Sequence, residues 1–289
     1  MSFASIAAVA AKGTVDGTGA AKSPEAGGSQ PEQTEQSEQE RPNSITLRLA
    51  RVKDAHDIAR FYAHYVTETA INFEYDIPPE EEFAKRIELV STRYPFIVAD
   101  LNGSQVVGYA FAHPMGERPA YGWSADTSIY LDADFRGHRI GPALYQALET
   151  LLKAQHVVRL FSCITVRGDD SLADIGGLPP QLDDVIGNDE DNGTAGADNS
   201  IDATVRTETH DPHLPDTSPR FHAALGYKPV GRNYAAGYKL GTWYDKLWME
   251  KPLRPLESKP KPIVPITELS KELIVKALEE GTRLIRQRD

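Results

Sequence analysis

The stretch 127–148 constrains the fold most strongly, because it has the pattern of a strand, a turn and a helix in direct succession. Ile129 and Leu131 share one face of the strand, since strand side chains alternate. A polar turn over 136–141 follows, and Pro142 suits the first turn of a helix. The leucines that give this helix an apolar stripe recur at helical spacing: Leu144, Leu148, Leu151 and Leu152.

A turn at the start of a helix is a place where an anion can bind. Its backbone N–H groups have no partner within the helix, and the positive end of the helix dipole lies at the same spot. The 136–141 turn matches neither G-x-G-x-x-G nor G-x-x-x-x-G-K-S/T, so a dinucleotide or P-loop nucleotide site is not the first choice. Taken alone, the stretch also fits an ordinary strand-to-helix connection in an α/β domain.

The periodicity of the remaining sequence predicts a mixed α/β sheet in one domain. Asn102-Gly103 between two apolar runs is typical of a tight hairpin turn. In chain order the expected elements are β-α-α-β-β-β-α-β-α-β-β. We expect strands at 45–49, 96–99, 105–112, 121–131, 159–166, 227–234 and 238–250, and helices at 55–66, 80–91, 142–152 and 219–225.

Three segments fall outside this pattern. Residues 1–43 bury too little apolar surface to fold, so we expect a disordered tail. Residues 167–217 carry thirteen acidic side chains against Arg167 and Arg206, and we expect an acidic, mostly disordered insertion. Its composition suggests calcium, but EF-hand spacing is absent, so we predict a solvated linker and no metal site. Residues 254–289 are expected to form a linker and an amphipathic helix that docks on the domain or on a partner.

The net charge of −11 comes from the tail and the insertion. The rest of the chain is mildly basic, which suits an anionic small ligand and is too weak to predict nucleic-acid binding. No apolar run is long enough to span a bilayer, so no membrane partner is expected. The one cysteine, Cys163, fits a reducing compartment, which we expect to be the cytoplasm. It lies in the apolar run LFSCITV, which predicts a buried small hydrophobe and not a nucleophile.

With this element order and the R-G-H-R-I-G turn in place, the chain resembles the GNAT acetyltransferases. These enzymes hold the pyrophosphate of acetyl-CoA on a Q/R-x-x-G-x-G/A loop. Within that superfamily, the chain resembles the phosphinothricin acetyltransferases. The resemblance implies a mostly antiparallel GNAT sheet over 44–253, acetyl-CoA as cosubstrate and a homodimer. The shared stretches are INFEY (71–75), RYPFIVAD (93–100), AYGWSADTSIYL (120–131), RFHAALGY (220–227) and AAGYKLGTWYD (235–245).

The resemblance assigns contacts with acetyl-CoA to two segments. In the family, backbone N–H groups near a bulge in the fourth strand lie beside the thioester, and here these belong to Ile129, Tyr130 and Leu131. Arg139 stands where the family has a glycine. Its guanidinium can meet a phosphate, or its side chain weakens binding if the position needs a positive φ. The pyrophosphate is expected over Arg136, Gly137, His138, Arg139, Ile140 and Gly141.

Two residues match family positions with a role in proton transfer. Asp126 stands where the phosphinothricin enzymes have the glutamate taken as general base. It is one methylene shorter, and a relaying water would restore the reach; the alternative is a polar residue on a strand edge. His222 matches the histidine of the family's R-F-H-x-A-L-G-Y helix. It is either a proton relay or charge partner, or a structural histidine with its hydrogen bonds satisfied.

The acceptor is expected to contact Phe73, Arg118 and Tyr121, which match positions that line the phosphinothricin pocket. A guanidinium offers a fixed fork for a carboxylate or phosphinate, and aromatic rings enclose an apolar stem. The alternative is a surface arginine and two core aromatics. The segment 214–218 resembles the family's L-P-N-x-x-S turn, with the asparagine missing.

We therefore hypothesise an acetyl-CoA-dependent N-acetyltransferase that acts on the free amine of a small amino-acid-like molecule. The transfer would be direct, in a ternary complex, with no acyl-enzyme. One alternative is a different amine class, such as an aryl amine, a polyamine or a protein N-terminus. The other is a non-catalytic CoA-binding scaffold on the same fold, which the departures at Arg139 and Asp126 keep open.

Overall fold

The computed structural model describes residues 44–167, 211–215 and 217–287. The expected disordered tail, and all but the edges of the expected acidic insertion, lie outside the described residues. Within the described part of the chain, no helix has the length and apolar character needed to cross a membrane.

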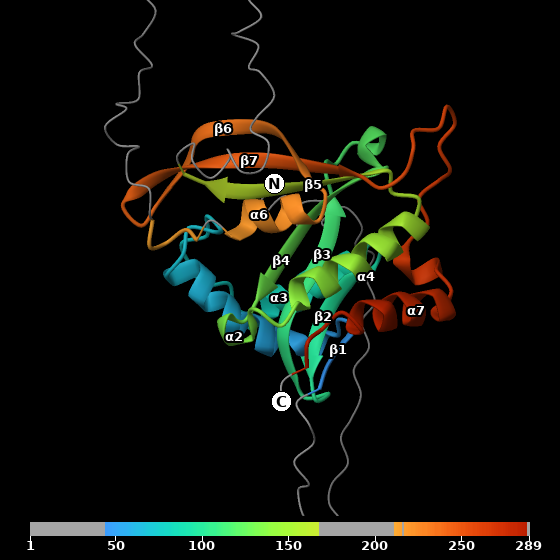
Figure 1. The fold of residues 1–289 in the computed structure, drawn as a ribbon, viewed down its shortest axis with the longest axis horizontal. Helices are drawn as coiled ribbons and strands as arrows, with labels where there is room; N and C mark the ends of the chain where they lie inside the picture. The colour runs from blue at the N-terminus through green and yellow to red at the C-terminus, as the bar shows by residue number, and fades with distance from the viewer. Residues whose placement is uncertain (1–43, 168–210, 216, 288–289) are drawn as a thin grey trace, which may run out of the picture.

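Seven strands form one sheet in the order β1-β2-β3-β4-β5-β7-β6 (Figure 1). Every neighbouring pair is antiparallel except β4 and β5, which are parallel. The predicted mixed, mostly antiparallel GNAT sheet is confirmed. The strands are β1 (Ile45–Leu49), β2 (Phe96–Leu101), β3 (Gln105–Pro114), β4 (Ser124–Leu131), β5 (Arg159–Val166), β6 (Lys228–Lys239) and β7 (Thr242–Pro252).

Helices cover both faces of the half of the sheet that β1 to β4 make (Figure 1). α4 and α7 lie on one face, whereas α2 and α3 lie on the other, and α6 packs beside β5. The element order along the chain is the predicted one, and α7 is the amphipathic helix expected within 254–289. The helices are α2 (Ala55–Thr67), α3 (Glu80–Ser91), α4 (Ile140–Ala154), α6 (Thr217–Ala224) and α7 (Lys271–Thr282).

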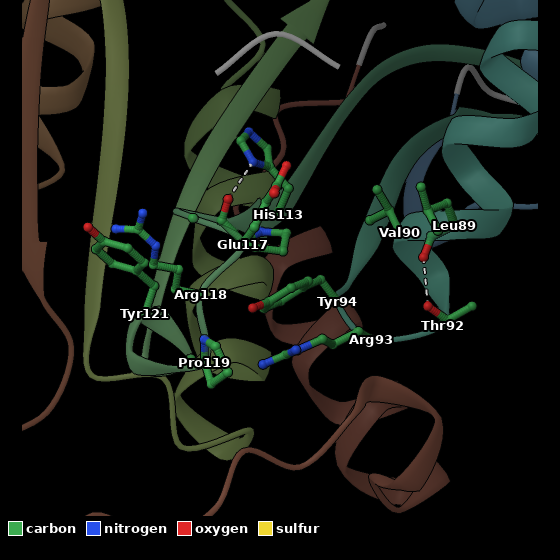
Figure 2. Close-up of a pocket in the computed structure, with 13 residues that line it drawn as sticks. Leu89, Val90, Thr92, Arg93, Tyr94, His113, Glu117, Arg118, Pro119 and Tyr121 are labelled. Atoms are coloured by element: carbon green, nitrogen blue, oxygen red, sulfur yellow. Dashed lines mark hydrogen bonds between the residues drawn. The ribbon is translucent and has the colours of Figure 1, made fainter. Parts of the chain in front are cut away.

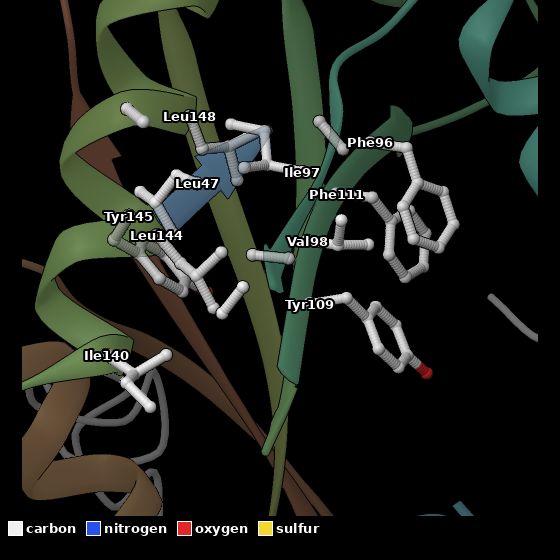
Figure 3. Close-up of a cluster of buried hydrophobic side chains, with 14 of the residues drawn as sticks. Leu47, Phe96, Ile97, Val98, Tyr109, Phe111, Ile140, Leu144, Tyr145 and Leu148 are labelled. Carbon is white, nitrogen blue, oxygen red and sulfur yellow. The ribbon is translucent and has the colours of Figure 1, made fainter. Parts of the chain in front are cut away.

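The core occupies both faces of the central strands, because successive residues of a strand point to opposite sides (Figure 3). On one face the rings of Phe96, Tyr109 and Phe111 stack, with Phe96 5.3 Å from Tyr109 and 5.0 Å from Phe111. On the other face Ile97 points toward α4, which packs on β2 (Figure 3). The whole leucine stripe predicted for this helix is 0% exposed. This packing fixes the start of α4 relative to the end of β4.

The last hairpin differs from the sequence prediction, which placed a break over 235–237. β6 continues to Lys239, and a register shift between Asn233 and Gly237 absorbs the extra residues. The carboxylate of Asp245 accepts the Ala235 N–H at 2.6 Å and so stabilises this irregularity. The turn itself comes later, at 240–241, where both residues have positive φ, 49° and 83°. An Ala-Ala-Gly run therefore makes a bulge here, not a turn.

The C-terminal helix α7 docks on its own domain, which answers the question that the sequence left open. It packs on α4 and β1 (Figure 1). A Cβ at Gly281 would lie 2.8 Å from the carbonyl oxygen of Ala143, so the two helices approach as closely as glycine allows. The Leu47 N–H of β1 donates to Thr282 Oγ1 at 2.9 Å. Beyond the helix, the Arg286 N–H donates to the carbonyl of His138 at 2.9 Å, in the turn before α4.

Candidate active site

The two halves of the sheet separate between β4 and β5. β4 pairs with β5 at three positions, the last of which is Asp126 opposite Phe161. β4 then continues beside β3 as far as Leu131, and β5 beside β7 as far as Val166. Thr127 Oγ1 donates to the carbonyl of Phe161 at 3.0 Å and marks the end of the shared ladder. Beyond this point, the facing edges of β4 and β5 are not paired with each other.

The open edge of β4 carries some of the amides predicted to meet the thioester. The Asp132 N–H donates to β3 at 2.9 Å, so by strand alternation the Tyr130 N–H also faces β3. The N–H groups of Ile129 and Leu131 face the open edge. The Leu131 N–H donates to the hydroxyl of Tyr65 at 3.2 Å. Of the three amides, that of Ile129 is therefore the best placed to bind a ligand. The β3–β4 register runs without a shift along these residues.

The turn before α4 has the open backbone that a phosphate needs. Gly137 has a φ of +86°, and no atom lies within 4 Å of the place that a Cβ would take. Within the described part of the chain, the N–H groups of Gly137, His138 and Arg139 make no backbone hydrogen bond. α4 begins at Ile140, and its first turn adds unpaired donors and the positive end of a dipole. These residues fit the pyrophosphate of acetyl-CoA.

Three side chains shape this turn in different ways. Arg136 donates to the hydroxyl of Tyr65 at 3.1 Å and is held over its ring. Arg139 is exposed and has a φ of 61°, so the position does require the left-handed region, in which an arginine costs about 1 kcal/mol. Gly141 serves packing, because a Cβ there would lie 2.9 Å from the ring of Phe221 in α6.

A cavity of about 420 Å³ lies where β4 and β5 separate. The strands β3 to β7 contribute to its lining, together with α2 and the segment between α2 and α3. The predicted base Asp126 and the predicted acceptor contact Phe73 both line it. Other polar residues of the lining include Asn72, Glu74, His113, Cys163 and Lys246.

Asp126 is 6% exposed, yet only one of its oxygens has a close partner. Oδ1 accepts the Thr127 N–H at 2.9 Å, whereas Oδ2 lies 3.9 Å from Nε2 of His113. Burial raises the pKa of Asp126, and the charges of His113 and Lys246 lower it in part. The raised pKa makes this carboxylate a stronger base than an exposed aspartate. It can therefore accept a proton from an ammonium group bound in the cavity.

His222 lies elsewhere, on the buried side of α6, and is 3% exposed. Its Nδ1–H donates to the carbonyl of Ser218 at 2.8 Å, and its Nε2 accepts from the hydroxyl of Tyr145 at 2.8 Å. Burial lowers the pKa of His222 to about 4, so the ring is neutral at physiological pH. Tyr145 is in turn 3.3 Å from Thr127 Oγ1, which links this network to the residue after Asp126. Both ring nitrogens are thus used within the protein.

Comparison with known proteins agrees with this geometry. Residues 47–175 match the model of the acetyltransferase (GNAT) domain family. The phosphinothricin N-acetyltransferase of Streptomyces viridochromogenes is 27% identical over 225 residues, which are 78% of this chain and 96% of that protein. The solved phosphinothricin acetyltransferase of Sinorhizobium meliloti in complex with acetyl-CoA is 26% identical, with a TM-score of 0.57 over 78% of this chain and 97% of its own. The chain is thus similar in sequence and in fold to the GNAT acetyltransferases.

These similarities identify the chain as an acetyl-CoA-dependent N-acetyltransferase, with acetyl-CoA as cosubstrate. A second relative, the phosphinothricin N-acetyltransferase of Alcaligenes faecalis, is 27% identical over 212 residues, which are 73% of this chain and 83% of that one. The cavity and the turn before α4 lie toward the two ends of the open edge of β4.

Sequence reasoning missed a charged residue of this GNAT cavity, Lys246. It lies on β7, and its Nζ donates to Thr165 Oγ1 at 2.8 Å and sits 4.0 Å from the centroid of the Phe73 ring. Burial lowers the pKa of Lys246, and the thiol of Cys163 and the carboxylate of Asp126 raise it in part. The available signal was the position of Lys246 in YDKLW, where it alternates with Tyr244 and Trp248 on one side of the strand. Only the sheet register shows that this position lines the cavity.

The predicted acceptor contacts are not brought together. Arg118 and Tyr121 line a neighbouring cavity, also of about 420 Å³, together with Arg93 and Tyr94 (Figure 2). His113 lines both cavities and stands between them. Tyr121 is 44% exposed, and Phe73 lies in the other cavity, against Lys246. The contact of Arg118 and Tyr121 with an acceptor stays a prediction.

The edges of the predicted insertion belong to the folded domain. Arg167 donates to Asp211 Oδ2 at 3.0 Å, and the hydroxyl of Tyr244 donates to the same oxygen at 2.9 Å. Leu214, from the interrupted family turn, packs with Ala70 and Tyr244 in a small apolar cluster. The Ala70 N–H also donates to the carbonyl of residue 213 at 2.9 Å. The chain after the insertion thus supports the segment that carries Phe73.

Proposed function

We propose that this GNAT enzyme acetylates the primary amine of a small amino-acid-like acceptor by direct attack in a ternary complex, with Asp126 as general base. The observation that carries the proposal is the nearly buried Asp126 carboxylate, with Oδ2 left without a close partner, in the cavity at the end of the β4–β5 ladder. Acetyl-CoA supplies the activated acetyl group.

Each residue of the site has a role in the proposed reaction that follows from its position. Oδ2 of Asp126 takes the proton of the acceptor's ammonium, directly or through one water, so that the nitrogen lone pair becomes the nucleophile. The Ile129 N–H, on the open edge of β4, donates to the oxygen that becomes negative during the attack. The amides of Gly137, His138 and Arg139 hold the pyrophosphate. His222 supports Thr127 through Tyr145 and, in this proposal, does not touch substrate.

Cys163 lines the same cavity but has no nucleophilic role in the proposal. Burial raises the pKa of its thiol, which keeps it protonated at neutral pH. Transfer is therefore to the acceptor amine without an acyl-enzyme. Cys163→Ala should leave the rate of acetylation within a few-fold of the wild type.

We further propose that the enzyme is a homodimer in the cytoplasm, as the family resemblance implies. The edge strand β6 and its neighbour β7 leave Tyr234, Tyr238 and Trp243 between 42% and 55% exposed, which is typical of a surface that another chain covers. Light scattering of the purified chain measures the mass directly. A monomer at micromolar concentration would remove this part of the proposal only.

The activity is tested by following free thiol release from acetyl-CoA across an amine panel. The panel contains phosphinothricin, glutamate, glutamine, an aryl amine, a polyamine and a peptide with a free N-terminus. We expect release with the amino acids, and its loss in Asp126→Asn but not in Cys163→Ala. Acetyl-CoA binding by calorimetry without release from any amine would instead support the scaffold alternative. A burst of acetylated enzyme that disappears in Cys163→Ala would overturn direct transfer.

A further inference from the structure

The C-terminal strap, residues 283–287, leaves the end of α7 and connects the edge strand β1 to the turn before α4 (Figure 1). Within the described part of the chain, β2 is the only strand beside β1. On its open edge, the Leu47 N–H donates to Thr282 Oγ1 at 2.9 Å, and the Ile45 N–H donates to Gln287 Oε1 at 2.7 Å. An edge strand often leaves such groups to solvent, so these bonds hold the strap at a fixed place on the domain.

Two residues anchor the strap, one on each side of Arg286. Ile285 is 7% exposed and belongs to the main hydrophobic core. Gln287 uses both ends of its amide on one residue, because its Nε2 also donates to the carbonyl of Ile45, at 3.2 Å. The strap cannot slide along β1 without losing this pair of bonds and exposing Ile285. The backbone of Arg286 is therefore held in place by its two neighbours.

Arg286 bonds to the turn before α4 in both directions. Its N–H donates to the carbonyl of His138 at 2.9 Å, and its own carbonyl lies 3.3 Å from Nδ1 of the His138 ring. Because a carbonyl can only accept, Nδ1 is the donor in this contact. Within the described chain, no other backbone hydrogen bond reaches residue 137 or 138. The middle of the turn is therefore held from outside by the strap.

The bond to His138 sets the direction of one amide predicted to meet a phosphate. The peptide group between His138 and Arg139 is planar and trans, so its C=O and its N–H point in opposite directions. Because the strap binds the C=O, the Arg139 N–H points away from the strap, and it makes no backbone hydrogen bond within the described chain. A carbonyl that accepts a hydrogen bond also polarises its own peptide group, which makes that N–H a stronger donor.

We propose that the C-terminal strap positions the cosubstrate turn, because the Arg286 backbone holds the 138–139 peptide group in the orientation in which the Arg139 N–H meets the pyrophosphate of acetyl-CoA. This rests on the proposed function, in which the pyrophosphate lies over this turn. Arg286 and Gln287 are positioning residues and touch neither the thioester nor the acceptor. Loss of the strap contact should therefore impair acetyl donors that carry the pyrophosphate and spare those that lack it.

The test compares two acetyl donors, acetyl-CoA and S-acetylpantetheine. They share the thioester and the pantetheine arm, and only acetyl-CoA carries phosphates. Thiol release by the full-length enzyme, with the best amine of the panel, gives kcat/KM for each donor, and the ratio of the two values is the readout. Because both donors use the same acceptor and the same base, a loss of folded enzyme cancels from the ratio. Salt is kept at about 0.3 M, at which the charge of an exposed arginine is largely screened.

The decisive pair of variants is Arg286→Pro, which removes the donating N–H, and Arg286→Ala, which keeps it and removes only the side chain. Arg286→Pro should lower the ratio about 2- to 10-fold, the effect of losing one hydrogen bond, through a higher KM for acetyl-CoA with kcat nearly unchanged. Arg286→Ala should leave the ratio unchanged. Gln287→Ala, which frees the strap from β1, should lower it by a smaller factor. Its matched control is Lys276→Ala, on the exposed face of α7, which should not change it.

Three outcomes would overturn the proposal. The first is an unchanged ratio in Arg286→Pro and Gln287→Ala, and the second is an equal loss for both donors, which a purely structural role would give. The third is the same change in Arg286→Ala as in Arg286→Pro, which would assign the effect to the side chain. Each of these leaves the proposed acetyltransferase standing.

If no amine releases thiol from either donor, it is the proposed function that fails. Calorimetry with acetyl-CoA alone, which needs no acceptor, then decides the role of the strap. We expect Arg286→Pro to bind acetyl-CoA about 2- to 10-fold more weakly than Arg286→Ala does. Equal binding by the two variants would contradict the proposal.

Discussion

The two buried groups predicted to transfer protons, Asp126 and His222, lie in regions that differ in how far their hydrogen-bonding capacity is used. In the Asp126 cavity, Oδ2 of the base and two donors of Lys246 have no close partner within the described chain. Around His222, both ring nitrogens are bonded at 2.8 Å. Buried polar groups are normally paired, so unused capacity in a cavity indicates a ligand, and complete pairing indicates structure.

The strongest way to break this comparison is Asp126→Asn. The amide keeps an oxygen for the Thr127 N–H but cannot accept the acceptor's proton, so kcat/KM should fall about 10²- to 10⁴-fold. Steady-state thiol release measures this, with Cys163→Ala as the control in the same cavity. An Asp126→Asn enzyme of wild-type rate would show that Asp126 is only a polar residue on a strand edge.

The same variant should be more stable than the wild type at neutral pH. Burial raises the pKa of Asp126, so the folded state holds its charge at a cost that the unfolded state does not have. The sign follows from the raised pKa: protonated Asp126 favours folding at low pH, and this contribution is lost as the pH rises through the folded pKa. The advantage of Asp126→Asn should therefore shrink toward the ordinary aspartate pKa of 3.8. Urea unfolding at several pH values checks it.

His222 should show the opposite pattern, with stability affected and catalysis nearly intact. Its pKa is about 4 in the folded state against 6.5 in a free histidine, so the unfolded chain takes up a proton first as the pH falls. Stability is full above pH 6.5 and should decline by about 3 kcal/mol on the way to pH 4. His222→Gln should flatten this limb, measured as unfolding free energy, and exposed His56→Gln should not. A large drop in kcat for His222→Gln at pH 8 would make His222 a relay after all.

Removing one member of the His222 network should have a smaller effect. Tyr145→Phe leaves Nε2 of His222 without a donor, and an unpaired buried acceptor costs about 1–3 kcal/mol. Tyr94→Phe is the matched control, because the buried hydroxyl of Tyr94 has no partner within the described residues and its loss leaves nothing unpaired. Denaturant midpoints give the two values. Equal effects in the two variants would remove the distinction between used and unused polar groups.

The sequence was sufficient where the signal is local. The bounds predicted at 45–49, 80–91 and 159–166 agree with β1, α3 and β5, because apolar periodicity and turn residues mark both ends of each element. It failed at 235–237, where a bulge held by Asp245 looks like a turn. The family resemblance, and not periodicity, supplied the mostly antiparallel pairing of the sheet and acetyl-CoA.

The composition of the cavity could not be predicted from sequence, because it depends on long-range register. Lys246 enters the cavity only because β7 pairs with β5 so that it lies opposite Thr165. Arg118 and Phe73 share a predicted role, but His113 of β3 separates them. The Nε2 of His222 is hydrogen-bonded to the hydroxyl of Tyr145, which lies 77 positions away in another helix. In each case the decisive partner is distant in the chain, and no local sequence pattern predicts it.

The smallest effect is expected from a substitution of Arg139. It lies in the turn before α4, where the N–H groups of residues 137–139 make no backbone hydrogen bond within the described chain. The backbone already has the φ of 61° that the family's glycine would adopt, so Arg139→Gly leaves the amides in place and changes only the side chain. Relief of left-handed strain is offset by the greater chain entropy of glycine, so stability should move by less than about 1 kcal/mol. The exposed guanidinium lies beside amides that fit a pyrophosphate, and its loss should weaken acetyl-CoA binding about 2- to 5-fold at low salt and less at high salt. Calorimetry at two ionic strengths measures this, and tighter binding by Arg139→Gly would mean that the side chain obstructs the cosubstrate.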